Sequence, residues 1–272
     1  MNSKPITIRK IKLEELHLIQ NFAPIEWNSN LEHIYKRHYK QHCFYPIVAC
    51  INDEIAGTGI AIVHQGVAWL GMIIVTENYR NQGLGSLITK HLTEYSTNQG
   101  ARTILLIASD MGFPVYKKSG FQHDLNYFFY KTDKRIDIEL VEKQISPIEI
   151  HDYETIFRLD KNVTNENRKE ILLDCLKSGY KYSEKEVSGY YLPDFGKGLI
   201  IAINQKTGLA LLKFKIMYEQ SVVCLPETNL RGIEFLYSIG YYEYMKSPRM
   251  FLGEKIAWKS ECVYARGCGY MG

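Results

Sequence analysis

The chain has 272 residues, with 33 Lys and Arg against 30 Asp and Glu, which gives a formal net charge of +3. This length allows one large domain or two of ordinary size, and we expect two. The charge is too close to balance to indicate a nucleic acid or an anionic membrane as partner, because such partners require a clustered basic face. We therefore expect neither partner.

The amino-terminal residues and the cysteines indicate the compartment. Residues 1–5 lead directly into an alternating run, without the apolar core and cleavage site of a secretory signal. Every apolar stretch is shorter than a bilayer requires. The six cysteines are scattered, with no CxxC pair and no spacing typical of a metal site or a disulfide framework. We expect a cytoplasmic protein that holds no metal.

The first half predicts one α/β domain. Strand-like and helical periods alternate, and short turns join three successive strands, which favours an antiparallel meander. A helix follows the third of these strands, and a short helix precedes the last strand of the domain. This order predicts one mixed, mostly antiparallel twisted sheet flanked by helices. The strands are expected at residues 6–10, 46–51, 54–63, 67–75, 102–109 and 127–130. The helices are expected at 13–20, 31–39 and 84–99, with a further short helix that ends at 116–121.

The second half repeats three landmarks of the first half in the same order. The number of residues between paired landmarks decreases along the chain, as deletions in the turns of a second copy would require. We interpret this as a duplicated fold, with a chance recurrence of common tripeptides as the alternative. The paired segments are 54–57 with 186–189, 82–87 with 205–210, and Gly120-Phe121 with Gly240-Tyr241.

The predicted domains are residues 1–142 and residues 147–272. The boundary is placed near Lys143–Pro147, where polar residues and a proline interrupt the periodic runs. Each domain would then carry one copy of the repeated fold.

A glycine-containing turn follows the strand at 67–75 and leads directly into a helix. Gly83 and Gly85 allow the backbone to approach a ligand and to adopt torsions that other residues avoid. The first N–H groups of the helix point to the same place, with the positive end of the helix dipole. Such a turn can bind a pyrophosphate. It differs from the phosphate loop of nucleotide hydrolases, because no Gly-Lys-Ser/Thr follows, and from the three-glycine dinucleotide fingerprint.

This turn resembles the signature of the GNAT superfamily of N-acetyltransferases, Arg/Gln-x-x-Gly-x-Gly/Ala. The resemblance extends to the strand order, to the Val-x-x-x-Tyr-Arg sequence before the turn and to a Tyr-x-x-x-Gly-Phe block. It implies a GNAT fold and an enzyme that transfers the acetyl group of acetyl-coenzyme A (acetyl-CoA) to a primary amine of a small molecule or peptide. The alternative is a tight turn without a ligand. The matching residues are Val75, Tyr79, Arg80, Gly83, Gly85, Tyr116, Gly120 and Phe121.

The resemblance also implies roles for individual residues. The edge of the strand that ends at Val75 would bind the pantetheine arm, and the glycine turn would bind the pyrophosphate. Tyr116 falls where many members carry a tyrosine whose hydroxyl protonates the departing thiolate, and a packing aromatic is the alternative, because the chain has 20 tyrosines. The implied cofactor-binding residues are Ile73, Ile74, Val75, Arg80, Asn81, Gln82, Gly83, Leu84, Gly85 and Ser86.

The reaction also needs a group that deprotonates the acceptor amine, and the sequence does not single one out. Glu26 is one candidate for this catalytic base, since it lies in the loop that overhangs the acceptor pocket in such proteins. Trp27 and Asn28 in the same loop are candidate acceptor-binding residues. Glu54 is a second candidate base, and a solvated surface acid is the alternative for both carboxylates.

The second half has lost the residues of this site. A side chain at the place of the first turn glycine would obstruct a pyrophosphate. This half also resembles the accessory carboxyl-terminal domain of a two-domain bacterial GNAT group, on Leu159-Asp160, Asn167-Arg168, Pro226-x-x-Asn229 and Arg249-Met250. The resemblance implies that it shapes the acceptor pocket or makes an assembly contact, such as that of a homodimer. With Gly208 set against Gly85, Lys206 stands for Gly83, Ile203 for Arg80 and Leu236 for Tyr116.

A function from another class competes with the enzyme. Duplicated transferase folds can become modules that sense acyl-CoA without turning it over. The intact Arg80, Gly83, Gly85 and Tyr116 favour the enzyme.

Overall fold

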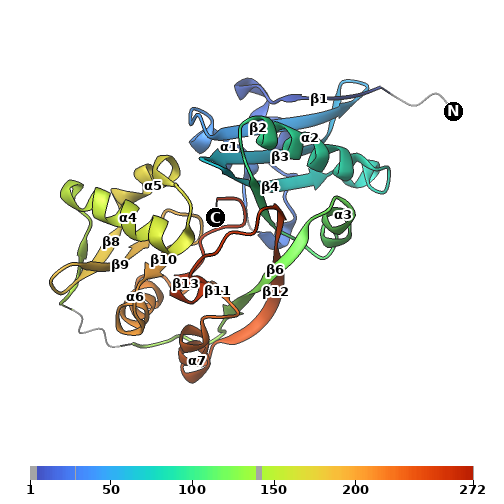
Figure 1. Cartoon of the computed structure of the whole chain (residues 1–272). Coiled ribbons are helices and arrows are strands. Elements are labelled where there is room, and N and C mark those ends of the chain that lie inside the picture. Colours follow the sequence, from blue (N-terminus) through green and yellow to red (C-terminus); the bar gives the residue numbers. More distant parts are fainter. Residues whose placement is uncertain (1–4, 28, 139–142, 272) are drawn as a thin grey trace. The chain divides into compact units, whose positions relative to one another are not determined.

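The computed structural model describes residues 5–27, 29–138 and 143–271, with the backbone alone at Glu26. The chain separates into two compact units (Figure 1). Unit 1 comprises the residues up to His123 together with Met250–Lys255 and Met271, and unit 2 comprises Asp124–Arg249 and Ile256–Tyr270. The domain boundary that we expect near Lys143–Pro147 stays a prediction, and residues 139–142 beside it lie outside the described residues.

Unit 1 is built on a mixed sheet in which β1, β2, β3, β4 and β5 are neighbours in that order. The first four strands pair antiparallel, and β4 pairs with β5 in parallel. Asn52 and Asp53 have positive φ angles of 50° and 65° in the two-residue turn between β2 and β3, as a tight hairpin requires. The strands are β1 (Ile6–Lys10), β2 (Phe44–Ile51), β3 (Glu54–His64), β4 (Val67–Val75) and β5 (Thr103–Ile107).

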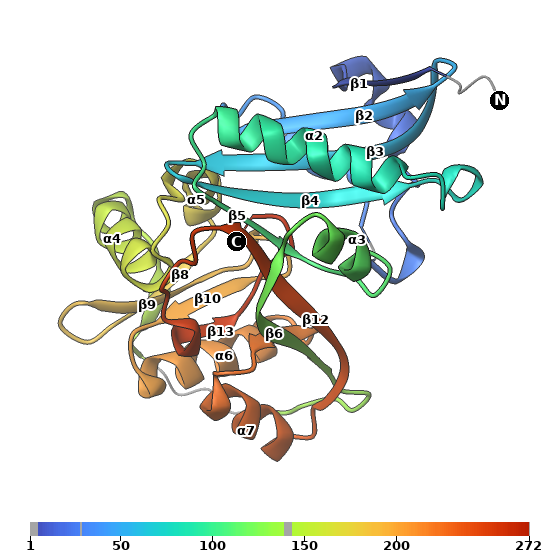
Figure 2. The same ribbon diagram turned by 45° about the vertical axis from the view of Figure 1, so that its right-hand side comes forward.

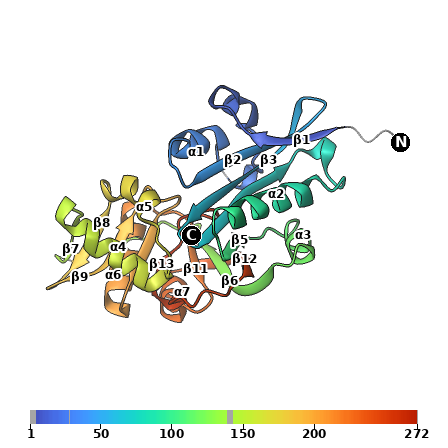
Figure 3. The ribbon, with the colours of Figure 1, turned by 45° about the horizontal axis from the view of Figure 1, so that its top comes forward.

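Helices cover both faces of this sheet, as the sequence predicts (Figures 2 and 3). Successive strand residues point to opposite faces. Phe44 contacts Tyr35 of α1, with ring centroids 5.7 Å apart, whereas the next residue, Tyr45, stacks on Tyr95 of α2 at 3.5 Å. The segment at 13–20, expected to be helical, forms a 3₁₀ helix. The helices are η1 (Leu13–Ile19), α1 (Leu31–His38), α2 (Leu84–Asn98) and α3 (Phe113–Lys118).

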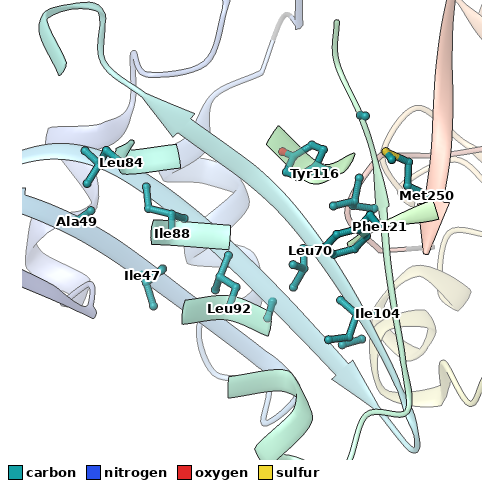
Figure 4. Close-up of a cluster of buried hydrophobic side chains, with 14 of the residues drawn as sticks. Ile47, Ala49, Leu70, Leu84, Ile88, Leu92, Ile104, Tyr116, Phe121 and Met250 are labelled. Atoms are coloured by element: carbon teal, nitrogen blue, oxygen red, sulfur yellow. The ribbon is translucent and has the colours of Figure 1, made fainter. Parts of the chain in front are cut away.

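The core beneath α2 explains why this helix lies where it does. Leu84, Ile88 and Leu92 follow one another at helical spacing and are buried against Ile47 and Ala49 of β2 (Figure 4). Two glycines of β3 let the helix approach closely. A Cβ atom at Gly59 would lie 2.9 Å from carbons of both Ile88 and Leu92. The glycine turn is therefore held against a rigid strand and helix.

The second half of the chain repeats the element order of the first half, which supports the duplicated fold. Three antiparallel strands lead to a helix, a strand, a short helix and a last strand in both halves. The elements of the first half, β2, β3, β4, α2, β5, α3 and β6 (Gln122–Lys131), correspond to β8 (Tyr180–Ser183), β9 (Val187–Leu192), β10 (Leu199–Ala202), α6 (Gln205–Tyr218), β11 (Val223–Pro226), α7 (Leu230–Ser238) and β12 (Tyr242–Gly253).

The turn after the short helix is the same in both copies. Gly120 and Gly240 have φ angles of 90° and 87°. The next residue bonds back to the helix each time, from Phe121 N to Tyr116 O at 3.0 Å and from Tyr241 N to Leu236 O at 2.9 Å. Glycine supplies the left-handed conformation at low cost. The sequence pairing of Gly120 with Gly240 thus has a structural basis.

Unit 2 contains further elements outside this repeat of seven. Its five-stranded sheet has the order β13-β10-β9-β8-β7, and β11 pairs with β6. These elements are β7 (Ile145–Pro147), α4 (Tyr153–Thr164), α5 (Lys169–Leu176) and β13 (Val263–Ala265). In neither unit do the described residues include a helix long and apolar enough to cross a bilayer.

Landmark residues of the second half are buried polar groups. Arg168 donates from Nε to Asp160 at 3.1 Å, and the Tyr190 hydroxyl donates to the same carboxylate. Asn229 caps α7 by accepting from Gly232 N at 2.8 Å. These charged and amide side chains therefore have hydrogen-bond partners inside unit 2, which offset the cost of burying polar groups.

Lys215 is a buried cation whose hydrogen bonds go to neutral acceptors. Its side chain lies on α6 and is 1% exposed. Nζ donates to Lys197 O at 2.8 Å and to Ser221 Oγ at 3.0 Å, both neutral acceptors. Among the described residues no carboxylate is within ion-pair distance of Nζ. Burial lowers the pKa of Lys215 to about 8, against a weaker opposing effect of Glu219.

Replacing Lys215 by methionine should stabilise the protein at pH 7. The ordinary pKa of 10.5 applies to the unfolded chain, which therefore binds more protons than the folded chain between about pH 8 and 10.5. The free energy of unfolding of the parent should rise across this range, by roughly 3 kcal/mol from this group at most. Urea unfolding at several pH values should show the rise in the parent and in exposed Lys90→Met, and its loss in Lys215→Met. Equal pH profiles for all three proteins would refute this assignment.

Candidate functional site

Strand β4 pairs with β5 along only part of its length. The parallel pairs are Val67 with Thr103, Ala68 with Ile104 and Trp69 with Leu105. From Leu70 to Val75, β4 pairs with β3 alone among the described residues. We call this stretch the open edge of β4. The residues expected to bind pantetheine, Ile73, Ile74 and Val75, lie on it, and that assignment stays a prediction.

The open edge contains a β-bulge at Met72. Thr58 pairs with Ile74 and Ile60 pairs with Gly71, so Met72 and Ile73 face one residue of β3. Met72 has a φ angle of +50°, which a side chain with a Cβ atom adopts at a cost of about 1 kcal/mol. Such strain concentrates at functional sites. The sequence gives no sign of it, because no glycine or asparagine stands at this position.

Beyond Val75, the chain turns through the glycine segment into α2. The turn begins with η3 (Glu77–Tyr79), and Gly83 is the N-cap residue of the helix. Gly83 has a φ of +82°, and Asn81 a φ of +61°. Gly83 has no side chain with which to cap the helix, so the first N–H groups lack this partner. A Cβ at Gly83 would meet nothing within 4 Å.

The surroundings of the turn fit a pyrophosphate. A Cβ at Gly85 would meet only Val75, at 3.9 Å, so the chain leaves space in front of the helix terminus. The guanidinium of Arg80 is held there, with Nε donating to Val75 O at 3.2 Å and Nη1 3.4 Å from Glu77. Gln82 Nε2 donates to Asn78 O at 3.1 Å. Open N–H groups, a helix dipole and a cation meet in one place.

The remaining residues of the turn divide between core and surface. Leu84 is buried in the core under α2, so it can offer a ligand only its backbone. Asn81, Gln82 and Ser86 are exposed. Their assignment to the pyrophosphate site stays a prediction.

Tyr116 lies on α3 and is 8% exposed. The ring packs edge-on against Phe121, with centroids 6.0 Å apart, and a Cβ at Gly112 would come within 2.7 Å of the ring. No hydrogen bond of its hydroxyl is found in the described part of the chain, and Figure 4 shows the hydroxyl directed away from Phe121 and Met250. Burial raises the pKa of Tyr116 to about 12. The hydroxyl therefore stays protonated at neutral pH.

The two candidate bases have different outcomes. The side chain of Glu26 and all of Asn28 lie outside the described residues, so the structure does not place them. Trp27 ends η2 (Ile25–Trp27), is half-buried and accepts a bond from Ser29 Oγ at 2.9 Å through its carbonyl. Glu54 accepts a bond from the Tyr79 hydroxyl at 2.8 Å. Glu54 thus holds the segment that precedes the glycine turn, a role that the sequence did not suggest.

Comparisons with known proteins agree with this arrangement. The model of the acetyltransferase (GNAT) family matches residues 13–121. A search of curated proteins returned no match. A candidate acetyltransferase from Pyrococcus horikoshii is 21% identical, with a TM-score of 0.84 over 100% of this chain and 98% of that chain. A GCN5-related N-acetyltransferase from Sphaerobacter thermophilus is 12% identical, with a TM-score of 0.63 over 99% of both chains.

A third structure shares the same architecture. A GCN5-related N-acetyltransferase from Anabaena variabilis ATCC 29413 is 11% identical, with a TM-score of 0.60 over 91% of this chain and 72% of that chain. At these identities the likeness to solved structures establishes the fold alone. Taken with the family match, it shows that this chain has the GNAT fold and that residues 13–121 match the GNAT family of acetyltransferases.

Proposed function

We propose that the protein is an N-acetyltransferase that transfers an acetyl group from acetyl-CoA to the primary amine of a small molecule or peptide. The observation that supports this most is the continuity of the open edge of β4 with the uncapped N-terminus of α2. The strand offers an edge that pairs with no other described strand beyond Trp69, and the helix that follows offers an anion site. A long, partly anionic ligand such as coenzyme A needs both in this order.

The residues of unit 1 would divide the work of holding acetyl-CoA, which supplies the acetyl thioester. Backbone groups of Ile73, Ile74 and Val75 would bond the pantetheine arm. The turn from Arg80 to Ser86 would hold the pyrophosphate through the helix N–H groups and the Arg80 guanidinium. The bulge at Met72 turns backbone groups out of the β ladder, which makes one available to a carbonyl oxygen on which negative charge develops.

Tyr116 would stabilise the departing sulfur through its hydroxyl. Its hydroxyl is in the donor form at neutral pH, because burial raises its pKa to about 12. An ordinary thiol has a pKa of about 8.5, so complete transfer to a free thiolate is uphill. The hydroxyl would therefore act while the carbon–sulfur bond breaks, by donating a hydrogen bond to the developing negative charge.

A thiol-release assay tests the function as a whole. The parent protein, acetyl-CoA and a panel of primary amines, amino acids, polyamines and peptides would be combined, and free coenzyme A measured against a reaction without acceptor. Turnover with any acceptor supports the proposal. Tight binding of coenzyme A by calorimetry without turnover on a broad panel would favour the sensor instead.

The variant Gly83→Glu should lose coenzyme A binding, because it places a side chain and a negative charge at the pyrophosphate site. The affinity should fall by roughly 100-fold or more. Gly100→Glu is the matched control, since Gly100 has a similar φ of +86° and an added Cβ there would also meet nothing within 4 Å, at the other end of α2. Both variants carry the same backbone strain. Calorimetry that gives equal affinities for the two would reject the site.

The variant Tyr116→Phe should lower turnover by about 100-fold to 10,000-fold, with coenzyme A affinity and Tm nearly unchanged. Tyr35→Phe is the contrasting control. In the parent, the Tyr35 hydroxyl is hydrogen-bonded to Thr58 Oγ1 at 2.7 Å in the core. Removal of this hydroxyl should therefore lower Tm and leave turnover unchanged. The loss in Tyr116→Phe should shrink with acyl donors that carry a more acidic thiol. Parent-like turnover of Tyr116→Phe with every donor and acceptor would make Tyr116 a packing residue.

A further inference from the structure

The register of the two sheets allows the two copies to be compared residue by residue. A glycine of the central strand pairs with the last residue of the following strand in each copy. A Cβ on that glycine would collide with the preceding carbonyl in each, at 2.8 Å from Ile74 O and at 2.9 Å from Ile201 O. The open edge of β4 therefore has its counterpart on β10. The pairs are Gly57 with Val75 and Gly189 with Ala202, so Ile73 and Ile74 correspond to Ile200 and Ile201.

The counterpart edge in unit 2 is not open. Strand β13 pairs with it antiparallel, Ala265 with Ile200 and Val263 with Ile201. These are the two residues that correspond to the pantetheine-binding positions Ile73 and Ile74. The carboxyl-terminal part of the chain thus makes the backbone bonds that a pantetheine arm would make on β4.

The same segment is also bonded to β11, the counterpart of β5. Arg266 N donates to Cys224 O at 2.8 Å, and Asn229 Nδ2, just beyond β11, donates to Val263 O at 2.8 Å. Strand β13 consequently lies between β10 and β11, as Figure 1 shows. In unit 1, no described strand fills the corresponding interval between β4 and β5 beyond Trp69.

The anion site is closed in unit 2 as well. Only two residues separate the end of β10 from α6, whereas eight separate β4 from α2. The side chain of Asn204 caps α6 by accepting from Thr207 N at 2.9 Å. The Tyr264 ring lies against Gly208, where an added Cβ would come under 3.0 Å from three ring atoms. The sequence pairing sets Gly208 against Gly85, which has open space before it, although Gly208 is the fourth residue of α6 and Gly85 the second residue of α2.

We propose that residues Val263–Arg266 are a built-in occupant of the second fold, in the place that the first fold reserves for an acyl donor. The comparison with an acyl donor rests on the proposed function of the open edge of β4. The contacts of residues Val263–Arg266 that carry the proposal all lie within unit 2. The second fold is then a closed module that binds no acyl-CoA, and its last strand stabilises it as a bound ligand would. One chain binds one coenzyme A.

A glycine-to-alanine pair tests the occupancy. In Gly208→Ala the new methyl and the Tyr264 ring compete for the same space, so Tm should fall by roughly 4 °C or more. Gly85→Ala is the matched variant in unit 1 and should leave Tm nearly unchanged, because its Cβ makes only an ordinary contact. Tyr264→Ala should also lower Tm by emptying the space. The decrease in Tm of the double variant Gly208→Ala/Tyr264→Ala should be clearly smaller than the sum of the decreases in the two single variants.

Additive losses at Gly208 and Tyr264, or a Tm of Gly208→Ala equal to that of Gly85→Ala, would overturn the proposal. If Gly208→Ala does not fold, recovery of folded protein in the double variant is the expected result, and failure of the double variant as well counts against it. Calorimetry of the parent with coenzyme A should give one site per chain, and two sites would also overturn it. Absence of any binding would refute the proposed function instead, while the Gly208–Tyr264 coupling would still report on the strand.

Discussion

A β-strand that leaves its neighbour must give its free backbone groups to another partner, and this requirement organises both halves of the protein. Strand β4 leaves β5 after Trp69, and the groups from Leu70 to Val75 face no strand on that side among the described residues. In unit 2 the equivalent groups of β10 are bonded to β13. Water can satisfy the groups of the first edge, whereas those of the second are satisfied by the chain itself.

The helix termini that follow the two strands obey the same rule. Four N–H groups at the start of a helix need acceptors from outside it. At α2 the N-cap is Gly83, which has no side chain to offer, and at α6 it is Asn204, which accepts from Thr207 N. The presence or absence of one amide side chain therefore distinguishes a terminus that can receive an anion from one that is already satisfied. In both copies, the backbone N–H groups that lack an acceptor within the chain are the ones that can bond an external acceptor.

The sequence predicts the parts of this arrangement that depend on local stereochemistry. The turn at Gly83 and the repeated turn at Gly120 and Gly240 could be recognised because only glycine adopts those torsions cheaply. The helix periods of α2 and the meander strands could be recognised from their alternation. The sequence pairing of Gly208 with Gly85 is displaced by two residues from the alignment of the helix N-caps, which sets Gly83 against Asn204 and Gly85 against Lys206.

Other features could not be predicted, for physical reasons. The bulge at Met72 is imposed by the register of β3 and β4, and a methionine gives no local signal of a positive φ. Strand β13 has three residues, too few to show a period, and its position depends on partners about sixty residues earlier. The role of Glu54 depends on Tyr79, which reaches it only in the folded sheet. Tertiary contacts of this kind override local preference.

The membership of residues Met250–Lys255 in unit 1 affects how the protein is made. Thr103 Oγ1 donates to Glu254 O at 2.7 Å, and Glu254 N donates to Arg102 O at 3.0 Å, across a separation of 151 residues for the first bond. On the ribosome, β5 and the residues before it are synthesised long before this partner exists. Unit 1 therefore completes these bonds only after residues 250–255 have been synthesised, and premature termination before Met250 leaves this part of unit 1 without its partner.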